Sequence, residues 1–358
     1  MSRKTILVTG GCGFVGRNLI RNLLTKKHTI WIIDNLSVGL HPDSWLPAGY
    51  KTPRLTDSKG RTVYEYPNDQ TVYMIHEDAI SFFYNQVYGT LRKPMDLPFF
   101  NEVYHLASIV GGRALIEGDP IKVAVDLAID SIFFLWLTRN PEQVGAVLYA
   151  SSSAIYPVHL QEEEGHVALK EEYIQFNENL GMPDLTYGWS KLTGELLTRI
   201  TAEKYNIHIA CIRPFSGYGE DQDLTYPVPS IENRIAKRKD PVKVWGTGKQ
   251  GRDFIHINDV IEAMQLILQK VSDGSGINVG SGKLHSFIEL IKLSADIAGY
   301  TPEIKPLLDK PVGVQSRYAD ISKMKEILGW EPKISLKEGL TRVLRYREEQ
   351  LKKEYEGK

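Results

Sequence analysis

A glycine-rich turn at residues 10–16 constrains the fold of this chain more than any other feature. Gly10, Gly13 and Gly16 follow a short apolar run at residues 6–8 and open an amphipathic segment. In this spacing the first glycine permits a tight turn, the second lets backbone N–H groups approach a pyrophosphate, and the third lets the following helix pack closely on the strand. Because a strand is expected before the turn and a helix after it, the pattern predicts a dinucleotide-binding turn.

The next strand is expected at residues 29–33 and ends at Asp34, 18 residues after Gly16. A carboxylate at this point can accept hydrogen bonds from a ribose diol and would repel a 2′-phosphate. Residues 35–38 include no Arg or Lys that would offset the repulsion, so NAD is predicted over NADP. Asp78, after the third strand, has two interpretations on spacing alone: a contact to the adenine amine or a solvated turn residue.

Strand and helix patterns alternate along the first 215 residues. Further strands are expected at residues 72–75, 102–106 and 145–150, and a helix at residues 121–138. The alternation predicts an α/β fold with a doubly wound parallel (Rossmann) sheet. Later residues form loops and amphipathic segments at 231–239, 260–271 and 336–353. We therefore expect an NAD-binding domain at 1–215, to which some later segments return, and a smaller C-terminal α/β substrate domain at 216–358.

One stretch, residues 37–72, interrupts the alternation. It is rich in Pro, Gly, Asp, Lys and Tyr and shows little periodicity. We interpret it as an inserted, partly ordered excursion with a small hairpin around residues 57–60.

The composition excludes several classes of partner and site. With 43 basic and 44 acidic residues, the chain gives no reason to expect a nucleic acid or an anionic membrane as its main partner. Cys12 and Cys211 are too few for a disulfide framework or a tetrahedral cysteine site, which makes a reducing, cytoplasmic location the expectation. No run of about 18 apolar residues is present, so no membrane span is expected.

Two residues four apart, Tyr187 and Lys191, place a phenol and an ammonium on one face of an expected helix. Tyrosine is a poor base at neutral pH because its reference pKa is about 10. A neighbouring lysine, joined by the positive charge of a bound nicotinamide, would stabilise the phenolate. The alternative for the isolated pair is an ordinary exposed Tyr/Lys pair.

Upstream of this pair, the apolar strand at residues 145–150 runs into the serines at 151–153. Ligands of doubly wound sheets bind outside the carboxyl ends of the strands. A serine hydroxyl there can hydrogen-bond a sugar hydroxyl or carbonyl and relay its proton to Tyr187. Turn chemistry alone explains serines after a strand, but it does not explain their occurrence together with Tyr187, Lys191 and the glycine turn.

Taken together, these residues resemble the extended short-chain dehydrogenase/reductases, specifically the NAD-dependent nucleotide-sugar epimerase/dehydratase family. The likeness covers nearly the whole chain and includes residues 10–16, 34–37, 105–107, 151–156, 187–191, 213–215, 251–256, 278–282 and 328–332. It implies an NAD-dependent enzyme with Ser152, Tyr187 and Lys191 as catalytic residues, in which hydride leaves a sugar carbon, usually C4. It implies cofactor contacts from Gly10, Gly13, Phe14, Val15, Gly16, Asp34, Asn35, Ser37, Asp78, Ala79, Leu106, Ala107, Tyr187 and Lys191.

Among the subfamilies, the chain is most similar to the GDP-mannose 3,5-epimerases, at residues 150–157 and 313–317. The resemblance implies substrate contacts from Gly111, Gly112, Ser152, Ser153, Ser216, Arg252 and Arg317, with the two arginines at the diphosphate. Two departures oppose 3,5-epimerisation: Ala154 replaces the cysteine of those enzymes, and the loop at 219–227 has no lysine. The Asp-Glu pair of the 4,6-dehydratases and the glutamate of decarboxylating members are also absent at Ser153–Ala154.

The residues that remain, Ser152, Tyr187 and Lys191, together with the cofactor, support oxidation and re-reduction at one carbon. We therefore expect a 4-epimerase of a GDP- or UDP-hexose, acting by transient C4 oxidation, with NAD as cofactor and no metal. The alternatives are a nucleotide-sugar 4-dehydrogenase/reductase, a 3,5-epimerase-like enzyme and, outside the enzymes, a catalytically silent NAD-sensing protein.

The resemblance also implies a homodimer, because family members pair through the helices that correspond to residues 121–138 and 192–205. Asp126 and Asp130 lie on the first of these segments and are expected to be surface carboxylates. Lys310 stands where the family usually has an arginine, and it would offer a point charge in place of a bidentate contact.

Overall fold

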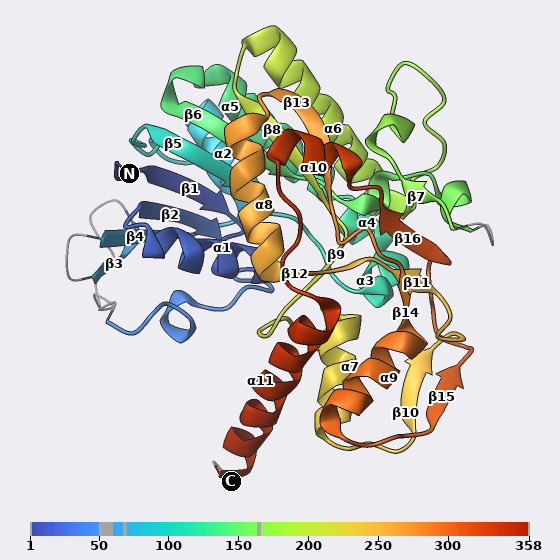
Figure 1. Ribbon diagram of the computed structural model, residues 1–358. Helices are drawn as coiled ribbons and strands as arrows, with labels where there is room; N and C mark the ends of the chain where they lie inside the picture. Colours follow the sequence, from blue (N-terminus) through green and yellow to red (C-terminus); the bar gives the residue numbers. More distant parts are fainter. Residues whose placement is uncertain (1, 50–59, 67–69, 163–165, 357–358) are drawn as a thin grey trace.

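The computed structural model describes residues 2–49, 60–66, 70–162 and 166–356. Its largest element is an eight-stranded sheet (Figure 1). The strand order is β13-β8-β6-β5-β1-β2-β4-β3, so the chain winds outward from β1 in both directions. All neighbouring strands are parallel except β3 and β4. The strands are β1 (Thr5–Thr9), β2 (Thr29–Asp34), β3 (Thr62–Tyr66), β4 (Gln70–His76), β5 (Phe100–His105), β6 (Val144–Ala150), β8 (Ile209–Pro214) and β13 (Asp273–Val279). The predicted doubly wound α/β sheet is confirmed.

Helices cover both faces of this sheet, as a parallel sheet requires. The helices are α1 (Phe14–Thr25), α2 (Ala79–Tyr88), α5 (Asp126–Arg139), α6 (Leu185–Tyr205), α8 (Ile257–Lys270) and α10 (Ser322–Leu328). Alternate strand residues point to opposite faces: Ile6 and Val8 pack with α1, α8 and α10, whereas Leu7 packs with α2 and α5. No helix in the described ranges is long and apolar enough to cross a membrane.

A second part of the molecule lies below the sheet in Figure 1 and has its own core. It contains α7 (Pro227–Ala236), α9 (Phe287–Ala298) and α11 (Leu336–Glu356), with the parallel strands β10 (Val242–Trp245) and β15 (Ile304–Leu307). Between its elements the chain returns to the large sheet through α8, β13 and α10. We retain residue 215 as the proposed boundary between the two parts.

Short strands link the two parts. A four-stranded sheet has the order β14 (His285–Ser286), β11 (Gly251–Arg252), β16 (Ser316–Ala319) and β7 (Ala168–Leu169). Beside it, β12 (Phe254–His256) pairs in parallel with β9 (Ser216–Tyr218). These strands place residues 252 and 317 side by side, because Arg252 is in register with Arg317.

Two expectations about local structure need correction. The helix expected at residues 121–138 is interrupted: α4 (Pro120–Val123) ends before α5 begins at Asp126. The excursion at 37–72 contains more structure than its composition suggested, since β3 pairs antiparallel with β4 at the edge of the sheet and Trp45 is buried against the core. Of the hairpin expected around residues 57–60, positions 57–59 lie outside the described residues.

Candidate active site

The glycine turn joins β1 to α1 in a geometry that only glycine tolerates. Gly10 has a φ of 66°, and a Cβ on it would lie 2.8 Å from the Ala107 nitrogen. A Cβ on Gly16 would lie 2.5 Å from the carbonyl oxygen of Gly10. Gly13 is the N-cap of α1 and supplies no side-chain cap, so the N–H groups of the first turn, at Phe14 and Val15, are available to an anion. This cradle fits the pyrophosphate of a dinucleotide.

Asp34 stands at the end of β2 beside this turn. Its Oδ2 accepts a hydrogen bond of 2.9 Å from the Cys12 N–H, and its Oδ1 accepts one of 2.8 Å from the Leu36 N–H. Burial raises the pKa of Asp34, while the two N–H groups oppose that rise. The carboxylate is therefore fixed next to the glycine turn, where a ribose diol can reach it.

The structure gives Asp78 a role that the spacing did not reveal. Asp78 is the N-cap of α2, because its Oδ1 accepts from the Ile80 N–H at 2.9 Å, and its Oδ2 accepts from Asn35 Nδ2 at 3.0 Å. Asn35 in turn accepts from the Ser37 N–H at 3.0 Å. Asp78 thus links the end of β2 to α2, and Ala79 follows it as the first residue of that helix.

Beside Gly10, the backbone after β5 is tied to Thr9, the last residue of β1. The N–H groups of Leu106 and Ala107 both donate to Thr9 Oγ1, at 3.1 Å each. The Thr9 hydroxyl lies 2.8 Å from His105 Nδ1. These contacts hold the carboxyl ends of two central strands together at the position where a doubly wound sheet binds its ligand.

The catalytic residues that the sequence predicted meet between β6 and α6. Ser152 is the N-cap of the 3-10 turn Ser153–Ile155, where its hydroxyl accepts from the Ala154 N–H at 3.1 Å, and its side chain lowers the pKa of the Tyr187 phenol. Lys191, one turn after Tyr187, is only 3% exposed. The adjacent Ser151 and Ser153 are buried. Of the three serines, Ser152 is the one that acts on the pKa of Tyr187.

The expectation that Asp126 and Asp130 lie on the surface is wrong. Asp126 accepts from Ser108 Oγ at 2.7 Å and from the Ile109 N–H at 2.6 Å, and Asp130 accepts from the Tyr149 hydroxyl at 2.6 Å. Both carboxylates are buried, because they share the face of α5 that packs against the sheet with Ile129, Phe133 and Leu137. Their spacing relative to those apolar residues was the signal that sequence reasoning missed.

These two carboxylates alter the pKa values of the predicted catalytic pair, Tyr187 and Lys191. Burial alone would lower the pKa of Lys191, but Asp130 and Asp126 raise it above its usual value, so the ammonium stays protonated. Burial raises the pKa of Tyr187; Lys191 and the Ser152 hydrogen bond lower it, and Asp126 raises it further. The net direction is upward, which leaves a proton on the phenol. The positive charge of an oxidised nicotinamide would oppose this rise.

Three arginines from distant segments converge near the start of α6. Asp184, the residue before the helix, accepts from Arg113 Nη1 at 2.8 Å and from Arg317 Nη2 at 2.8 Å. Arg252 donates to the backbone carbonyls of Val312 and Val314, at 3.0 and 2.9 Å. Burial, together with the charge of Arg317, lowers the pKa of Arg252 to about 9. The cluster carries excess positive charge and fits an anion such as a diphosphate.

Arg252 and Arg317 of this cluster follow from the sequence, whereas Arg113 does not. Arg113 begins α3 (Arg113–Gly118) and follows Gly112, the N-cap of that helix. A Cβ on Gly112 would lie 2.6 Å from the carbonyl oxygen of Thr225, so the glycine permits close contact with a neighbouring loop. In the sequence, only the position of Arg113 directly after Gly111 and Gly112 could have indicated that it belongs to the site.

Ser216, the remaining predicted substrate contact, begins β9, and its N–H donates to the Asp253 carbonyl at 2.9 Å. Its neighbours Arg213 and Phe215 are buried. Arg213 binds Glu195 of α6 at 2.7 Å and the Tyr156 hydroxyl at 2.9 Å. It therefore fixes the helix that carries Tyr187 to β8.

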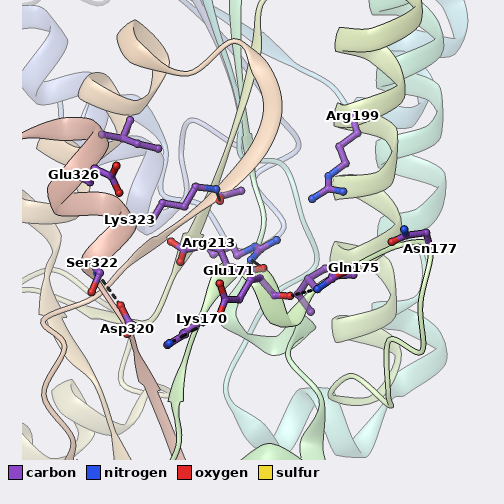
Figure 2. Close-up of a pocket in the computed structure, with 14 residues that line it drawn as sticks. Lys170, Glu171, Gln175, Asn177, Arg199, Arg213, Asp320, Ser322, Lys323 and Glu326 are labelled. Atoms are coloured by element: carbon purple, nitrogen blue, oxygen red, sulfur yellow. Dashed lines mark hydrogen bonds and ion pairs between the residues drawn. The ribbon is translucent and has the colours of Figure 1, made fainter.

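A pocket of about 770 Å³, lined in part by Arg213, lies between residues 170–177, α6 and α10 (Figure 2). Its lining carries charges of both signs, with Arg199 on α6 and Lys323 and Glu326 on α10. None of the predicted site residues lines it. The catalytic site is therefore defined by the convergence of side chains at the strand ends and not by this pocket.

Known proteins resemble this chain in sequence over most of its length. A sequence model of the NAD dependent epimerase/dehydratase family matches residues 6–280. The uncharacterized UDP-glucose epimerase YtcB of Bacillus subtilis is 29% identical over 345 residues, which cover 95% of this chain and 97% of that protein. UDP-glucuronic acid decarboxylase 1 of Xenopus tropicalis is 27% identical over 352 residues, 96% of this chain and 72% of that protein.

The fold is also shared with solved structures. A crystal structure of UDP-glucose 4-epimerase with UDP-glucose from Thermotoga maritima superposes with a TM-score of 0.75. The superposition covers 97% of this chain and 99% of that chain, at 24% sequence identity. At this identity the likeness establishes the arrangement of helices and strands.

Proposed function

The chain belongs to the NAD-dependent epimerase/dehydratase family, and we propose that it is a nucleotide-sugar 4-epimerase that acts on a UDP-hexose. Membership of this family makes it an NAD-dependent enzyme, as the sequence predicted. The UDP moiety is proposed because the similar proteins named above carry UDP-sugar names, and none of them carries a GDP-sugar name. UDP-linked substrates therefore replace GDP-linked ones as the first choice.

One observation carries the proposal: Ser152, Tyr187 and Lys191 converge, while Ala154 beside them is an apolar, buried side chain. A phenol, a serine hydroxyl and an ammonium suffice to move one proton at one sugar hydroxyl. Elimination, decarboxylation or epimerisation beside the oxidised carbon needs a further acid or base. Ala154 offers none at the position where related enzymes carry one.

We assign the steps to residues as follows. Tyr187 accepts the proton of the C4 hydroxyl, with Ser152 hydrogen-bonded to the same group, and later returns that proton. Lys191 remains protonated and stabilises the phenolate. NAD, held by the glycine turn and Asp34, would supply the acceptor and then the donor of the C4 hydride. The C4 epimer would result when that hydride came back to the opposite face of the sugar.

The remaining assigned residues hold the two ligands. We propose that the glycine turn, Asp34 and the backbone at Leu106–Ala107 bind NAD, with Asn35, Ser37, Asp78 and Ala79 alongside. The arginines Arg252 and Arg317 bind the diphosphate, and Arg113 joins them. The Gly111–Gly112 loop, Ser153 and Ser216 are proposed to line the sugar.

The test is a screen of UDP-hexoses and UDP-hexuronates in D₂O, followed by GDP-mannose, with products identified by NMR and mass spectrometry. A 4-epimerase gives the C4 epimer without deuterium in the product, because the carbon-bound hydrogen never exchanges with solvent. Deuterium at C3 or C5 would show 3,5-epimerase chemistry, and loss of CO₂ would show a decarboxylase. Accumulation of free keto sugar with stoichiometric NADH would replace the proposal with a 4-dehydrogenase.

Variants of the site provide the matched controls. Tyr187→Phe and Ser152→Ala are expected to lower kcat by about 10²–10⁴, the range that positioned acid–base groups contribute. Ser151→Ala, next to the catalytic serine in a buried position, should retain activity. Tyr187→Phe with near wild-type turnover would refute the mechanism. Bound NAD without turnover of any sugar nucleotide would support the non-catalytic sensor instead.

We also propose that the protein is a homodimer paired through α5 and α6. Apolar side chains on these helices are solvent-exposed: Leu127 on α5 and Leu196 on α6 are each 38% exposed, and Trp189 on α6 is 41% exposed. Analytical ultracentrifugation of wild type should give a dimer, and Trp189→Glu with Leu196→Glu should give a monomer. Leu308→Glu, at an exposed apolar residue near β15, is the control. A wild-type monomer at micromolar concentration would contradict the proposal.

A further inference from the structure

A loop of the second part, residues 219–226, spans the distance from the cofactor turn to the sugar-side loop; we call it the strap. It connects β9 to α7. At its start, a Cβ on Gly219 would lie 3.2 Å from Cζ of Phe14, the first residue of α1. At its end, the carbonyl oxygen of Thr225 lies against Gly112. The strap therefore lies beside both proposed ligand positions.

Within the strap, Asp221 makes a dense set of contacts to one face of α1. Its Oδ2 lies 2.9 Å from Arg21 Nη1 and 3.4 Å from Arg17 Nε. Its Oδ1 accepts a hydrogen bond of 3.1 Å from Asn18 Nδ2, and its backbone carbonyl accepts one of 3.1 Å from Arg17 Nη2. Three residues of α1, Arg17, Asn18 and Arg21, thus contact one strap residue.

Arg17 also contacts the glycine turn. Arg17 Nη1 donates to the carbonyl oxygen of Cys12, inside the turn, at 2.7 Å. Its side chain is 5% exposed, and that of Asp221 is 15% exposed. An ion pair so little exposed is screened far less by water and salt than a surface pair. The turn, Arg17 and the strap are therefore mechanically connected.

Charge keeps this connection formed at neutral pH. Burial alone would raise the pKa of Asp221, but Arg17, Asn18 and Arg21 bring it below its usual value. The carboxylate is therefore ionised wherever the enzyme works near neutrality, and both arginines retain their partner.

On either side of Asp221 the strap is fixed to the second part of the molecule. Glu220 Oε2 lies 3.2 Å from His256 Nε2. The Gln222 side chain donates to the Gly217 carbonyl at 3.2 Å, and the backbone carbonyl of Gln222 accepts from Arg347. Asp221 is thus the point at which the strap crosses to the cofactor-binding part.

We propose that Asp221 is a cofactor-retention residue: by tying the strap to α1, it closes the side of the dinucleotide site next to the glycine turn and slows the release of NAD and NADH. The proposal rests on NAD as the cofactor and is independent of the proposed 4-epimerisation. Its consequence is that oxidation and re-reduction can occur on one enzyme molecule without exchange of cofactor with solvent.

The experiment measures release directly, without any sugar. Enzyme is saturated with NADH, and the loss of its fluorescence is followed by stopped flow after addition of excess NAD. Asp221→Asn, which keeps the shape but removes the charge, should release NADH at least 10-fold faster than wild type. After gel filtration it should also carry less nucleotide. Asp223→Asn is the matched control on the same strap, because an asparagine can keep its contact to the Thr225 N–H.

A second variant separates retention from folding. Arg21→Gln removes the partner of Asp221 on the exposed side of α1 and leaves Arg17 on the glycine turn. It should also speed release, and the double variant with Asp221→Asn should be little faster than Asp221→Asn alone, because that substitution already removes the charge with which Arg21 pairs. Release from both single variants within twofold of wild type would overturn the proposal. A chain that retains NADH in this way and yet converts no sugar would refute the epimerase proposal alone.

Discussion

The Tyr149 hydroxyl donates a 2.6 Å hydrogen bond to Asp130, and the Lys191 ammonium lies 5.3 Å from the centre of the same tyrosine ring. The other oxygen of Asp130 lies 3.2 Å from His105 Nε2, so the carboxylate is held from two strands. Burial lowers the pKa of His105, which keeps it neutral. A negative charge therefore lies beside Lys191, where it holds that lysine protonated and at the same time opposes the phenolate of Tyr187.

Removing that charge should shift the pH dependence of catalysis. In Asp130→Asn, the loss of a nearby negative charge favours the Tyr187 phenolate, while Asp126 still holds Lys191 protonated. We expect the acid limb of kcat/KM to move to lower pH by about 0.5–1 unit. The exposed substitution Glu142→Gln should leave the profile unchanged. A shift toward higher pH would mean that Asp130 acts chiefly through the orientation of Lys191.

Substitution of Asp34 should weaken the preference for NAD. Asp34→Ser removes the carboxylate that accepts from the ribose diol and repels a 2′-phosphate. The ratio of NADH to NADPH affinity, measured by fluorescence titration, should fall by about 10-fold or more, since 1.4 kcal/mol corresponds to a factor of ten. Asp78→Asn, which can still cap α2, should keep the wild-type ratio. An unchanged ratio in Asp34→Ser would place the discrimination elsewhere.

The arginine cluster should give substrate affinity an alkaline limit. Because the pKa of Arg252 is lowered to about 9, the free enzyme loses a positive charge from this cluster as the pH rises through that value. Wild-type kcat/KM should therefore decline above about pH 9, and KM should rise. Arg252→Met should show a KM about 10-fold or more higher at neutral pH, consistent with a charge-assisted hydrogen bond, and no decline of this origin. Arg199→Met, at the separate pocket in Figure 2, is the control.

One buried carboxylate should make folding stability depend on pH. Glu232 is 0% exposed, has Ser294 as a hydrogen-bond donor, and its pKa is raised by burial to about 8. Because the unfolded chain releases this proton at about pH 4.5, stability falls as the pH rises from there and levels off above about 8. Glu232→Gln should be stabilised by a few kcal/mol at pH 8.5 and hardly at all at pH 4.5. Denaturant titrations at both pH values, with exposed Glu349→Gln as control, test this.

The features that could be predicted from the sequence are those with a local signal. The glycine turn and Asp34 lie within one strand–helix–strand unit, and Tyr187 and Lys191 lie on one helix turn. Their spacing therefore carries their geometry. The family match confirms the enzyme class and the NAD cofactor that these residues predicted, while the individual site assignments stay predictions.

What escaped prediction depends on contacts between segments far apart in the chain. Asp184 and Arg317 are separated by 133 positions, and Arg17 and Asp221 by 204. No periodicity or motif spacing encodes such a meeting; it follows from how the short strands between the two parts align. Asp126 was different. Its spacing from the apolar residues of α5 already placed it on the buried face of that helix, but its charge led to the expectation that it lies on the surface.

The return of β13 to the large sheet has a consequence for how this protein could have arisen and how it can be engineered. β13 pairs with β8, although 58 residues separate the end of one from the start of the other. A fragment that stopped at residue 215 would keep the pairing of β8 with β6, but the other edge of β8 would be unpaired, and one face of the sheet would lack α8 and α10. The open strand edge and the apolar surface favour aggregation. Residues 1–215 are therefore not expected to fold as a separate domain. A gene fusion that replaces the second part must keep α8, β13 and α10, the segments that return to the large sheet.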